Sequence, residues 1–186
     1  PSKNEEIRQA VDISNHLKIK DKYKDQLTYR LNPSGVELLE YGQNDFIYIN
    51  NGDFNFDKIE VGSPRFMAGD PSNNMTIKDW GLTTRFQDID NDGDPDIYVC
   101  NDFWTPDRIW VNNGEGKFST LDNLEMRKSS SSTMSVDFSD IDRNGTMDFF
   151  VADMLSRDHK KKKTQMGLMS PTAISIGKID NRPQYM

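Results

Sequence analysis

Five aspartates occupy every second position of the stretch DIDNDGDPD, and the apolar run IYVC follows it directly. They are Asp88, Asp90, Asp92, Asp94 and Asp96. Two unit charges 4 Å apart repel by about 1 kcal/mol in water and by roughly 4 kcal/mol at the effective dielectric near a protein surface. A tight turn through these carboxylates is therefore destabilised unless a cation lies among them. The spacing predicts a metal-binding loop, and the alternative is an aspartate-rich turn that binds no metal.

The same pattern recurs 52 residues later, in DFSDIDRNGTMDFFVADM at 137–154. This stretch aligns with RFQDIDNDGDPDIYVCND at 85–102, so that each loop has the same three aspartates and one glycine. The aligned pairs are Phe86 with Phe138, Asp88 with Asp140, Asp90 with Asp142, Gly93 with Gly145, and Asp96 with Asp148.

A different motif recurs with an offset of 62 residues, as NDFIYINNGDFNF at 44–56 and PDRIWVNNGEGKF at 106–118. Each copy has a short apolar run, then Asn-Asn-Gly, then a phenylalanine. Two interleaved motifs that recur in the same order indicate an internal structural repeat rather than chance similarity.

The apolar runs FIYI, TRFQ, IYVC, RIWV, SVDF and FFVA are short and rich in aromatic and β-branched residues, which is typical of strands. Asn-Asn-Gly is a hairpin signal, because Asn and Gly adopt positive φ at low cost. One unit thus consists of a strand, an Asp loop, a strand, a connection, a strand, an NNG turn and a strand. We expect strands near 46–50, 83–87, 96–100, 108–112, 135–139 and 148–152.

Four antiparallel strands per unit predict a β-propeller blade, because one such sheet cannot bury both faces without neighbours. The chain holds about two and a half units, so the predicted fold is all-β and a segment of a larger propeller. The expected division is 1–43 insertion, 44–65 end of a blade, 66–127 full blade, 128–154 start of the next blade, and 155–186 insertion.

The two predicted insertions differ in character from the repeats. SKNEEIRQAVDISNHL, at 2–17, begins with a capping-box pattern and places apolar residues on one helical face, which predicts a short helix. Residues 155–186 are expected to lack long strands, and HKKKK at 159–163 is expected to be a solvated loop rather than a polyanion site. KSSSST at 128–133 predicts a flexible connection between blades.

Composition excludes several classes of function. The net charge of −7 argues against a nucleic-acid-binding protein. No window approaches the length of a membrane span, and the polar opening PSKNEE does not resemble a signal peptide, which leaves the compartment open. The sequence contains no GxSxG, HExxH or glycine-rich phosphate loop, and the surroundings of His16 and His159 do not suggest ligands or bases. The single cysteine, Cys100, is predicted to be an unpaired, buried small hydrophobe.

The loops do not fit an EF-hand, which needs a glutamate at position 12, because that position is Val99 in the first loop and Val151 in the second. The run D-x-D-x-[DN]-G-x-x-D between two strands instead resembles the calcium loops of FG-GAP repeats in integrin α propellers. The wider match, through NDF, PDRIWVNNGEGKF and DFFVADM, resembles the VCBS/FG-GAP repeats of secreted proteins of the cartilage acidic protein and ASPIC/UnbV type.

The resemblance implies two Ca²⁺ sites. The first would use the carboxylates of Asp88, Asp90, Asp92 and Asp96 and the carbonyl of Asp94. The second would use Asp140, Asp142 and Asp148, the side-chain oxygen of Asn144 and the carbonyl of Thr146. All-oxygen ligation by a flexible loop suits Ca²⁺ better than Mg²⁺. Asn144 removes one charge, so weaker affinity is expected in the second loop.

The leading functional hypothesis is a non-catalytic, calcium-stabilised propeller segment of a secreted, cell-surface or periplasmic protein, with a protein or carbohydrate ligand. The alternative is part of a carbohydrate-active enzyme, such as a polysaccharide lyase, built on a calcium-binding propeller. Four aromatic residues could then form a sugar-stacking surface, although core positions are the commoner use of aromatics in strands. They are Trp80, Phe103, Trp104 and Trp110.

Overall fold

The computed structural model describes residues 11–12, 18–32, 35–66, 78–102, 105–121, 129–130, 132–154, 158, 160–161 and 184–185. The chain divides into two compact units, residues 1–43 and 44–186, and each is described by itself. No helix among the described residues is long and apolar enough to cross a membrane.

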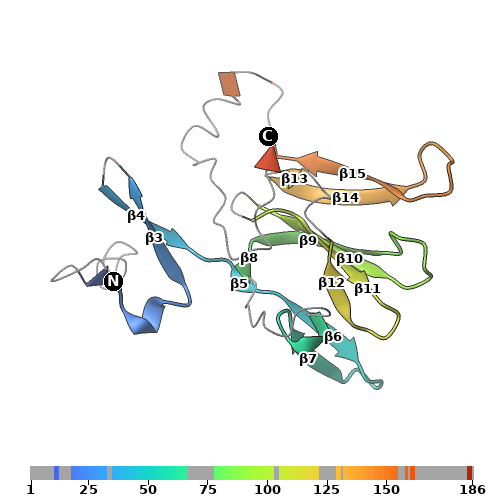
Figure 1. The fold of residues 1–186 in the computed structure, drawn as a ribbon, viewed down its shortest axis with the longest axis horizontal. Helices are drawn as coiled ribbons and strands as arrows, with labels where there is room; N and C mark the ends of the chain where they lie inside the picture. The colour runs from blue at the N-terminus through green and yellow to red at the C-terminus, as the bar shows by residue number, and fades with distance from the viewer. Residues whose placement is uncertain are drawn as a thin grey trace. The chain divides into compact units, whose positions relative to one another are not determined.

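The first unit contains two antiparallel strand pairs (Figure 1). β1 (Val11–Asp12) pairs with β2 (Lys18–Ile19), and a 3₁₀ turn, η1 (Asp21–Tyr23), leads to the hairpin of β3 (Leu27–Asn32) and β4 (Gly35–Glu40). The sequence analysis did not predict this hairpin, although LTYRLN alternates apolar and polar residues with the period of a strand.

The short helix predicted over 2–17 is wrong where the structure describes it. Val11 and Asp12 lie in β1, and Val11 is paired with Ile19. A β-branched residue has a modest helix propensity, and cross-strand pairing with a second β-branched residue favours the strand. Residues 2–10 and 13–17 lie outside the described part of the chain.

The second unit is built around a four-stranded antiparallel sheet of order β12-β11-β10-β9. Its strands are β9 (Gly81–Gln87), β10 (Asp96–Asn101), β11 (Arg108–Asn112) and β12 (Phe118–Thr120). The Asp loop joins the first two strands and the NNG turn joins the last two. The order of elements predicted for one blade is therefore confirmed.

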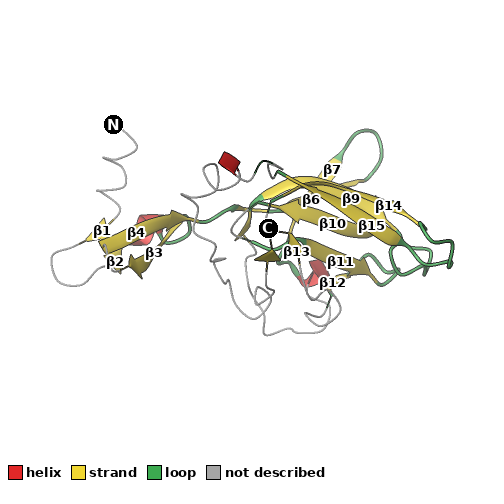
Figure 2. Cartoon of the chain, turned by 90° about the horizontal axis from the view of Figure 1, so that it is seen from above, coloured by secondary structure: helices red, strands yellow, loops and turns green. Residues whose placement is uncertain are grey.

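A hairpin packs on each face of this sheet, as the side-by-side strands in Figures 1 and 2 show. The hairpins are β6 (Phe46–Asn50) with β7 (Phe56–Glu60), and β14 (Thr133–Ser139) with β15 (Asp148–Asp153). All six predicted strands are present at or within two residues of their predicted bounds. The all-β arrangement of small antiparallel sheets is consistent with a segment of a propeller.

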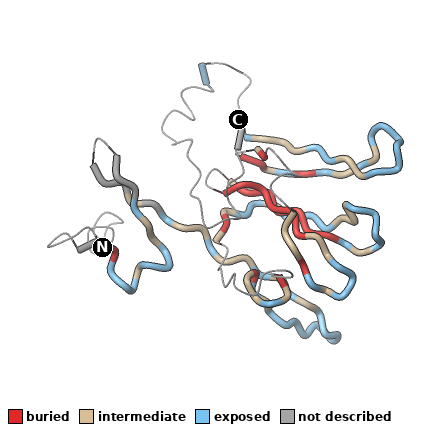
Figure 3. Tube along the Cα trace, viewed as in Figure 1, coloured by how far each residue is buried: buried red, intermediate tan, exposed pale blue. Residues whose placement is uncertain are grey.

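Every residue of β10 is buried, and Figure 3 shows that this strand lies at the centre of the buried region. Ile97 and Val99 face one cluster with Trp110, where Phe66 stacks on Phe118 with ring centroids 5.0 Å apart. Alternate residues of the strand face the second cluster, which holds Tyr98, Cys100, Ile109 and Val136. A strand buried on both faces needs continuous apolar character, and IYVC supplies it. The prediction that Cys100 is free and buried is confirmed.

Short elements accompany these strands. They are η2 (Pro64–Phe66), the pair β5 (Gln43–Asn44) with β8 (Lys78–Asp79), and the parallel pair β13 (Ser129–Ser130) with β16 (Gln184–Tyr185). The flexible connection predicted at 128–133 is wrong for its described residues, because Ser129, Ser132 and Thr133 are buried and β14 begins at Thr133. Residues 155–186 are described only at five positions, where β16 is two residues long, so the prediction for this segment lies largely outside the described residues.

Candidate metal centre

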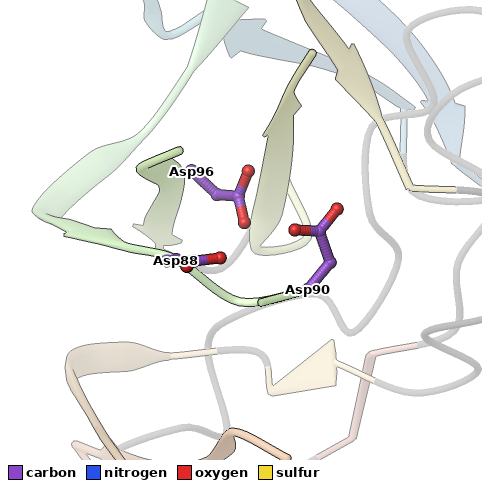
Figure 4. Close-up of side chains that lie close together, drawn as sticks. All are labelled: Asp88, Asp90 and Asp96. Atoms are coloured by element: carbon purple, nitrogen blue, oxygen red, sulfur yellow. The ribbon is translucent and has the colours of Figure 1, made fainter. Parts of the chain in front are cut away.

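Three aspartates of the first loop converge at the turn between β9 and β10. Asp88, Asp90 and Asp96 each place one carboxylate oxygen within 4.8 Å of the others, and Figure 4 shows the three side chains close together. Asp88 directly follows β9, and Asp96 is the first residue of β10. Carboxylate oxygens at this separation can share one hard divalent cation.

The loop winds around its own carboxylates. Asp88 Oδ1 accepts a hydrogen bond from the backbone N–H of Asp92 (3.2 Å), and its Oδ2 accepts one from Gly93 (3.0 Å). The turn requires positive φ at Asn91 (62°) and Gly93 (98°). Asn and Gly are the residues that adopt this conformation at least cost. Each carboxylate oxygen has two lone pairs, so these bonds leave it able to bind a cation.

Asp96 is the most firmly held of the three. Its side chain is fully buried, with Oδ2 accepting from the N–H of Ile89 (2.8 Å) and Oδ1 from the N–H of Asn112 (2.8 Å). The first bond closes the loop and the second fixes it to β11. A rigid carboxylate thus forms the base of the site, while Asp90 is exposed at its rim.

The other two predicted residues of the first loop lie outside this group of three. Asp92 Oδ1 accepts from the N–H of Asp94 (2.9 Å) in a local turn. The Asp94 side chain lies against the NNG turn, because a Cβ atom added to Gly114 would be 2.6 Å from Asp94 Oδ2. The roles of the Asp92 carboxylate and of the Asp94 carbonyl as ligands stay predictions.

The second loop repeats the geometry of the first. Asp140, Asp142 and Asp148 also bring carboxylate oxygens within 4.8 Å of one another. Asp140 accepts from the N–H groups of Asn144 (3.0 Å) and Gly145 (2.9 Å), and Asp148 Oδ2 accepts from Ile141 N–H (3.0 Å). These bonds match, at an offset of 52 residues, those of Asp88 and Asp96. The positive φ values recur too, at Arg143 (62°) and Gly145 (85°).

Asn144 and Thr146 lie outside the second group of three carboxylates. The Asn144 Oδ1 atom accepts from the N–H of Thr146 (2.7 Å) and from its hydroxyl, and the Asn144 amide donates to Asp142 Oδ2 (3.1 Å). The amide therefore occupies part of the space between the carboxylates without adding charge. Ligation by Asn144 and by the Thr146 carbonyl stays a prediction.

The electrostatics of the first loop fit a cation site. The pKa of the Asp90 carboxyl is raised, first by partial loss of hydration and then by the negative charges of Asp96, Asp92 and Asp88, against a lowering by the Asp92 N–H. A cation among these carboxylates would reverse the effect of the neighbouring charges.

The two loops touch each other, which sequence reasoning did not predict. Asn91 Nδ2 donates to the Gly145 carbonyl (3.4 Å). Two interactions join the adjacent strands β9 and β14. Arg85 forms an ion pair with Asp137 (3.2 Å), and the Thr83 hydroxyl donates a hydrogen bond to the Met134 carbonyl (2.8 Å). The two acidic loops therefore lie at the same edge of the second unit, as Figure 1 shows.

The predicted sugar-stacking surface is not present at Trp110. That side chain is 2% exposed and belongs to the core, with Phe66 against it edge-on at 5.3 Å between ring centroids. Trp80 is half-buried, and Phe103 and Trp104 lie outside the described residues.

Sequence reasoning also missed two buried carboxylates. Asp107 accepts hydrogen bonds from the Tyr98 hydroxyl (2.8 Å), the Thr133 hydroxyl (2.7 Å) and the Asn101 N–H (2.8 Å). Burial raises the pKa of this carboxyl, while those three bonds lower it. The second is Asp79, the last residue of β8, which is 3% exposed. Asp45, which precedes β6, is half-buried. No local sequence signal marks Asp79 and Asp107 as buried.

Comparison with known families agrees with this geometry. Residues 88–151, about a third of the chain, match the family model of FG-GAP-like repeats. The matched segment begins at the first aspartate of the first loop and ends within β15, so it contains both acidic loops. Comparison with curated proteins and with solved structures gave no match.

The segment 88–151 therefore resembles an FG-GAP-like repeat. The FG-GAP resemblance predicted from the loops is confirmed. The assignment to the cartilage acidic protein and ASPIC/UnbV type stays a prediction.

Proposed function

We propose that the chain is a calcium-stabilised β-propeller segment, non-catalytic, of a secreted, cell-surface or periplasmic protein that binds a protein or carbohydrate ligand. The observation that carries the calcium part is the convergence of three carboxylates in each of two loops with the same hydrogen-bond scheme. The FG-GAP-like match over both loops supports it.

The ion would act mainly on stability. It would neutralise a loop that joins two adjacent strands of one sheet, β9 to β10 or β14 to β15. The donor set contains only oxygen, which suits Ca²⁺ at six to eight ligands better than the strict octahedron of Mg²⁺. Extracellular calcium modules commonly bind at about 10⁻⁴ to 10⁻³ M, which fits a compartment with millimolar calcium.

The experiment is calcium titration by calorimetry, combined with thermal melting in calcium and in chelator. A cation that binds only the folded state adds RT ln(1 + [L]/Kd), about 2.7 kcal/mol at a hundredfold excess over Kd and less near Kd. We expect calcium to raise the melting temperature and equimolar magnesium to raise it less. Asp90→Ala should remove the part of the response that belongs to the first loop.

Asp57→Ala is the matched control, because Asp57 is an exposed carboxylate on β7 outside both loops. It should keep the full calcium response. If calorimetry detects no calcium uptake and the chelator leaves the melting curve unchanged, the aspartates are turn formers and the calcium proposal is wrong.

The second candidate function is part of a carbohydrate-active enzyme, such as a polysaccharide lyase. It rests on the aromatic residues Trp80, Phe103 and Trp104, since Trp110 is in the core. A glycan array and a lyase assay separate the two functions: glycan binding without cleavage supports the first, and cleavage supports the second.

A further inference from the structure

A pocket of about 120 Å³ lies on the face of the central sheet that packs against the β6–β7 hairpin. Ile47, Val99 and Trp110 form part of its apolar lining, with Trp110 only 2% exposed. Phe46 and Phe86, which are 40% and 58% exposed, line it where it opens to solvent. An apolar cavity of about 150 Å³ can hold benzene, which has six heavy atoms. By the same ratio of volume to atoms, this pocket has room for roughly five heavy atoms.

Among the described residues, the lining contains one ionisable group, Asp45. Its Oδ2 atom is buried and has no hydrogen-bond partner among the described residues. A carboxylate in that position is costly, because a buried charge needs either pairing or protonation.

The cation whose charge acts on Asp45, Arg108, is already engaged by another carboxylate. Arg108 donates through Nε to Asp79 Oδ2 and through Nη2 to Asp79 Oδ1 (2.8 Å), and both side chains are almost fully buried. Asp45 feels the charges of both residues. With Asp45 ionised, the group of Asp45, Asp79 and Arg108 therefore carries one net negative charge against an apolar pocket.

We propose that this pocket binds the side chain of a lysine presented by a protein segment. The side chain beyond Cα has four methylene carbons and one nitrogen, which matches the five heavy atoms that the pocket can take. The methylene stem would lie along Ile47 and Phe86, and the ammonium group would pair with the Asp45 carboxylate. This inference goes beyond the calcium-dependent function and is independent of it.

The charge of the chain supports a cationic occupant. The chain carries a net charge of −7, which favours the approach of basic segments. Lysine fits better than arginine, because the arginine side chain beyond Cα has seven heavy atoms and the pocket has room for about five.

The test uses the chain of residues 1–186 in calcium-free buffer at pH 8, where Asp45 is ionised. Binding of the capped tripeptide Gly-Lys-Gly is followed through the backbone amide resonances of Ile47 and Thr84. The same tripeptide with norleucine in place of lysine keeps the stem and removes the charge. Butylammonium chloride tests whether a free amine is the better ligand.

We expect the lysine peptide to bind with a Kd in the millimolar range, and the norleucine peptide at least about tenfold more weakly. Asp45→Asn keeps the shape of the side chain and should weaken binding of the lysine peptide by about tenfold, while Asp57→Asn should leave it unchanged. Lys58→Met should leave binding intact or strengthen it, because it removes a competing cation. These results would be the same with and without calcium, so the inference stands or fails separately from the calcium sites.

Three results would overturn the proposal. The first is that the lysine peptide does not shift the resonances of Ile47 and Thr84. The second is that the norleucine peptide binds as tightly as the lysine peptide. The third is that the Asp45→Asn variant binds the lysine peptide as tightly as the wild type does. Binding of butylammonium with no binding of the lysine peptide would also overturn it, because the occupant would then be a small free amine.

Discussion

Asp96 at the start of β10 accepts a hydrogen bond from the backbone N–H of Asn112 at the end of β11, with 2.8 Å between Oδ1 and N. This bond joins the first acidic loop to a third strand of the central sheet. The equivalent aspartate of the second loop, Asp148, accepts only from Ile141 among the described residues. The two loops share their internal geometry but differ in how firmly the sheet holds them.

The difference predicts unequal costs for the two Asp→Asn changes in the absence of calcium. Asp96→Asn leaves one acceptor where the N–H groups of Ile89 and Asn112 both need a partner. The free energy of unfolding should therefore fall by about 1 to 3 kcal/mol. Asp148→Asn, at a half-exposed position, should lower it by about 1 kcal/mol or less. Urea denaturation in chelator measures both. Equal losses would show that the bond to Asn112 does not stabilise the first loop.

Asn144 in the second loop corresponds to Asp92 in the first, so the residue of each loop can be substituted by that of the other. Asn144→Asp removes the bond from Asn144 Nδ2 to Asp142 and adds a fourth carboxylate, so we expect a lower melting temperature in chelator. In calcium the added charge should tighten the second loop by on the order of tenfold.

Asp92→Asn is the matched reverse change and should weaken the first loop by a similar factor. Calorimetric titration of the two variants and the wild type measures these shifts. If both changes moved the affinity in the same direction, charge at this position would not determine calcium affinity.

The chemistry of Cys100 provides a probe of global unfolding. Its side chain is 0% exposed, and the pKa of its thiol is raised to about 12, first by burial and then by the charge of Asp107. The thiolate is the reactive form, so a thiol reagent should label the native protein slowly at pH 8 and the urea-unfolded protein rapidly. Complete labelling of the native protein within minutes would contradict the buried position.

The sequence predicts features that depend on neighbouring residues, and it does not predict features that depend on contacts between residues far apart in the chain. The strands and both acidic loops follow from local signals, namely short apolar runs, NNG turns and alternate aspartates, and they are present where they were expected. The ion pair of Arg108 with Asp79 and the bond from Thr133 to Asp107 join residues 29 and 26 positions apart. Nothing in the local sequence marks those aspartates as buried, so only the packed strands reveal them.

The strands of the first unit illustrate a different limit. β1 lies inside a segment with a capping-box pattern and helical apolar spacing, yet Val11 is paired with Ile19. Short elements depend mainly on the partner they find, and propensity over two residues is too weak to decide between helix and strand.

The last prediction concerns Asp45 and the pH dependence of stability. The pKa of this carboxyl is raised to about 6, first by burial and then by the charge of Asp79, against the opposing charge of Arg108. The folded chain therefore holds a proton on Asp45 that the unfolded chain releases near pH 4. Stability from this group is present below about pH 4 and is lost as the pH rises to about 6 and above.

Asp45→Asn keeps a neutral polar side chain at every pH, so it should remove this loss. The free energy of unfolding of the variant should exceed that of the wild type by about 1 to 3 kcal/mol at pH 8, and the two should converge near pH 4. Urea denaturation at pH 4, 6 and 8, in chelator so that the acidic loops contribute equally to both proteins, measures the difference. The exposed Asp57→Asn change should show no such trend. A difference between Asp45→Asn and the wild type that is constant with pH would show that folding does not raise the pKa of Asp45.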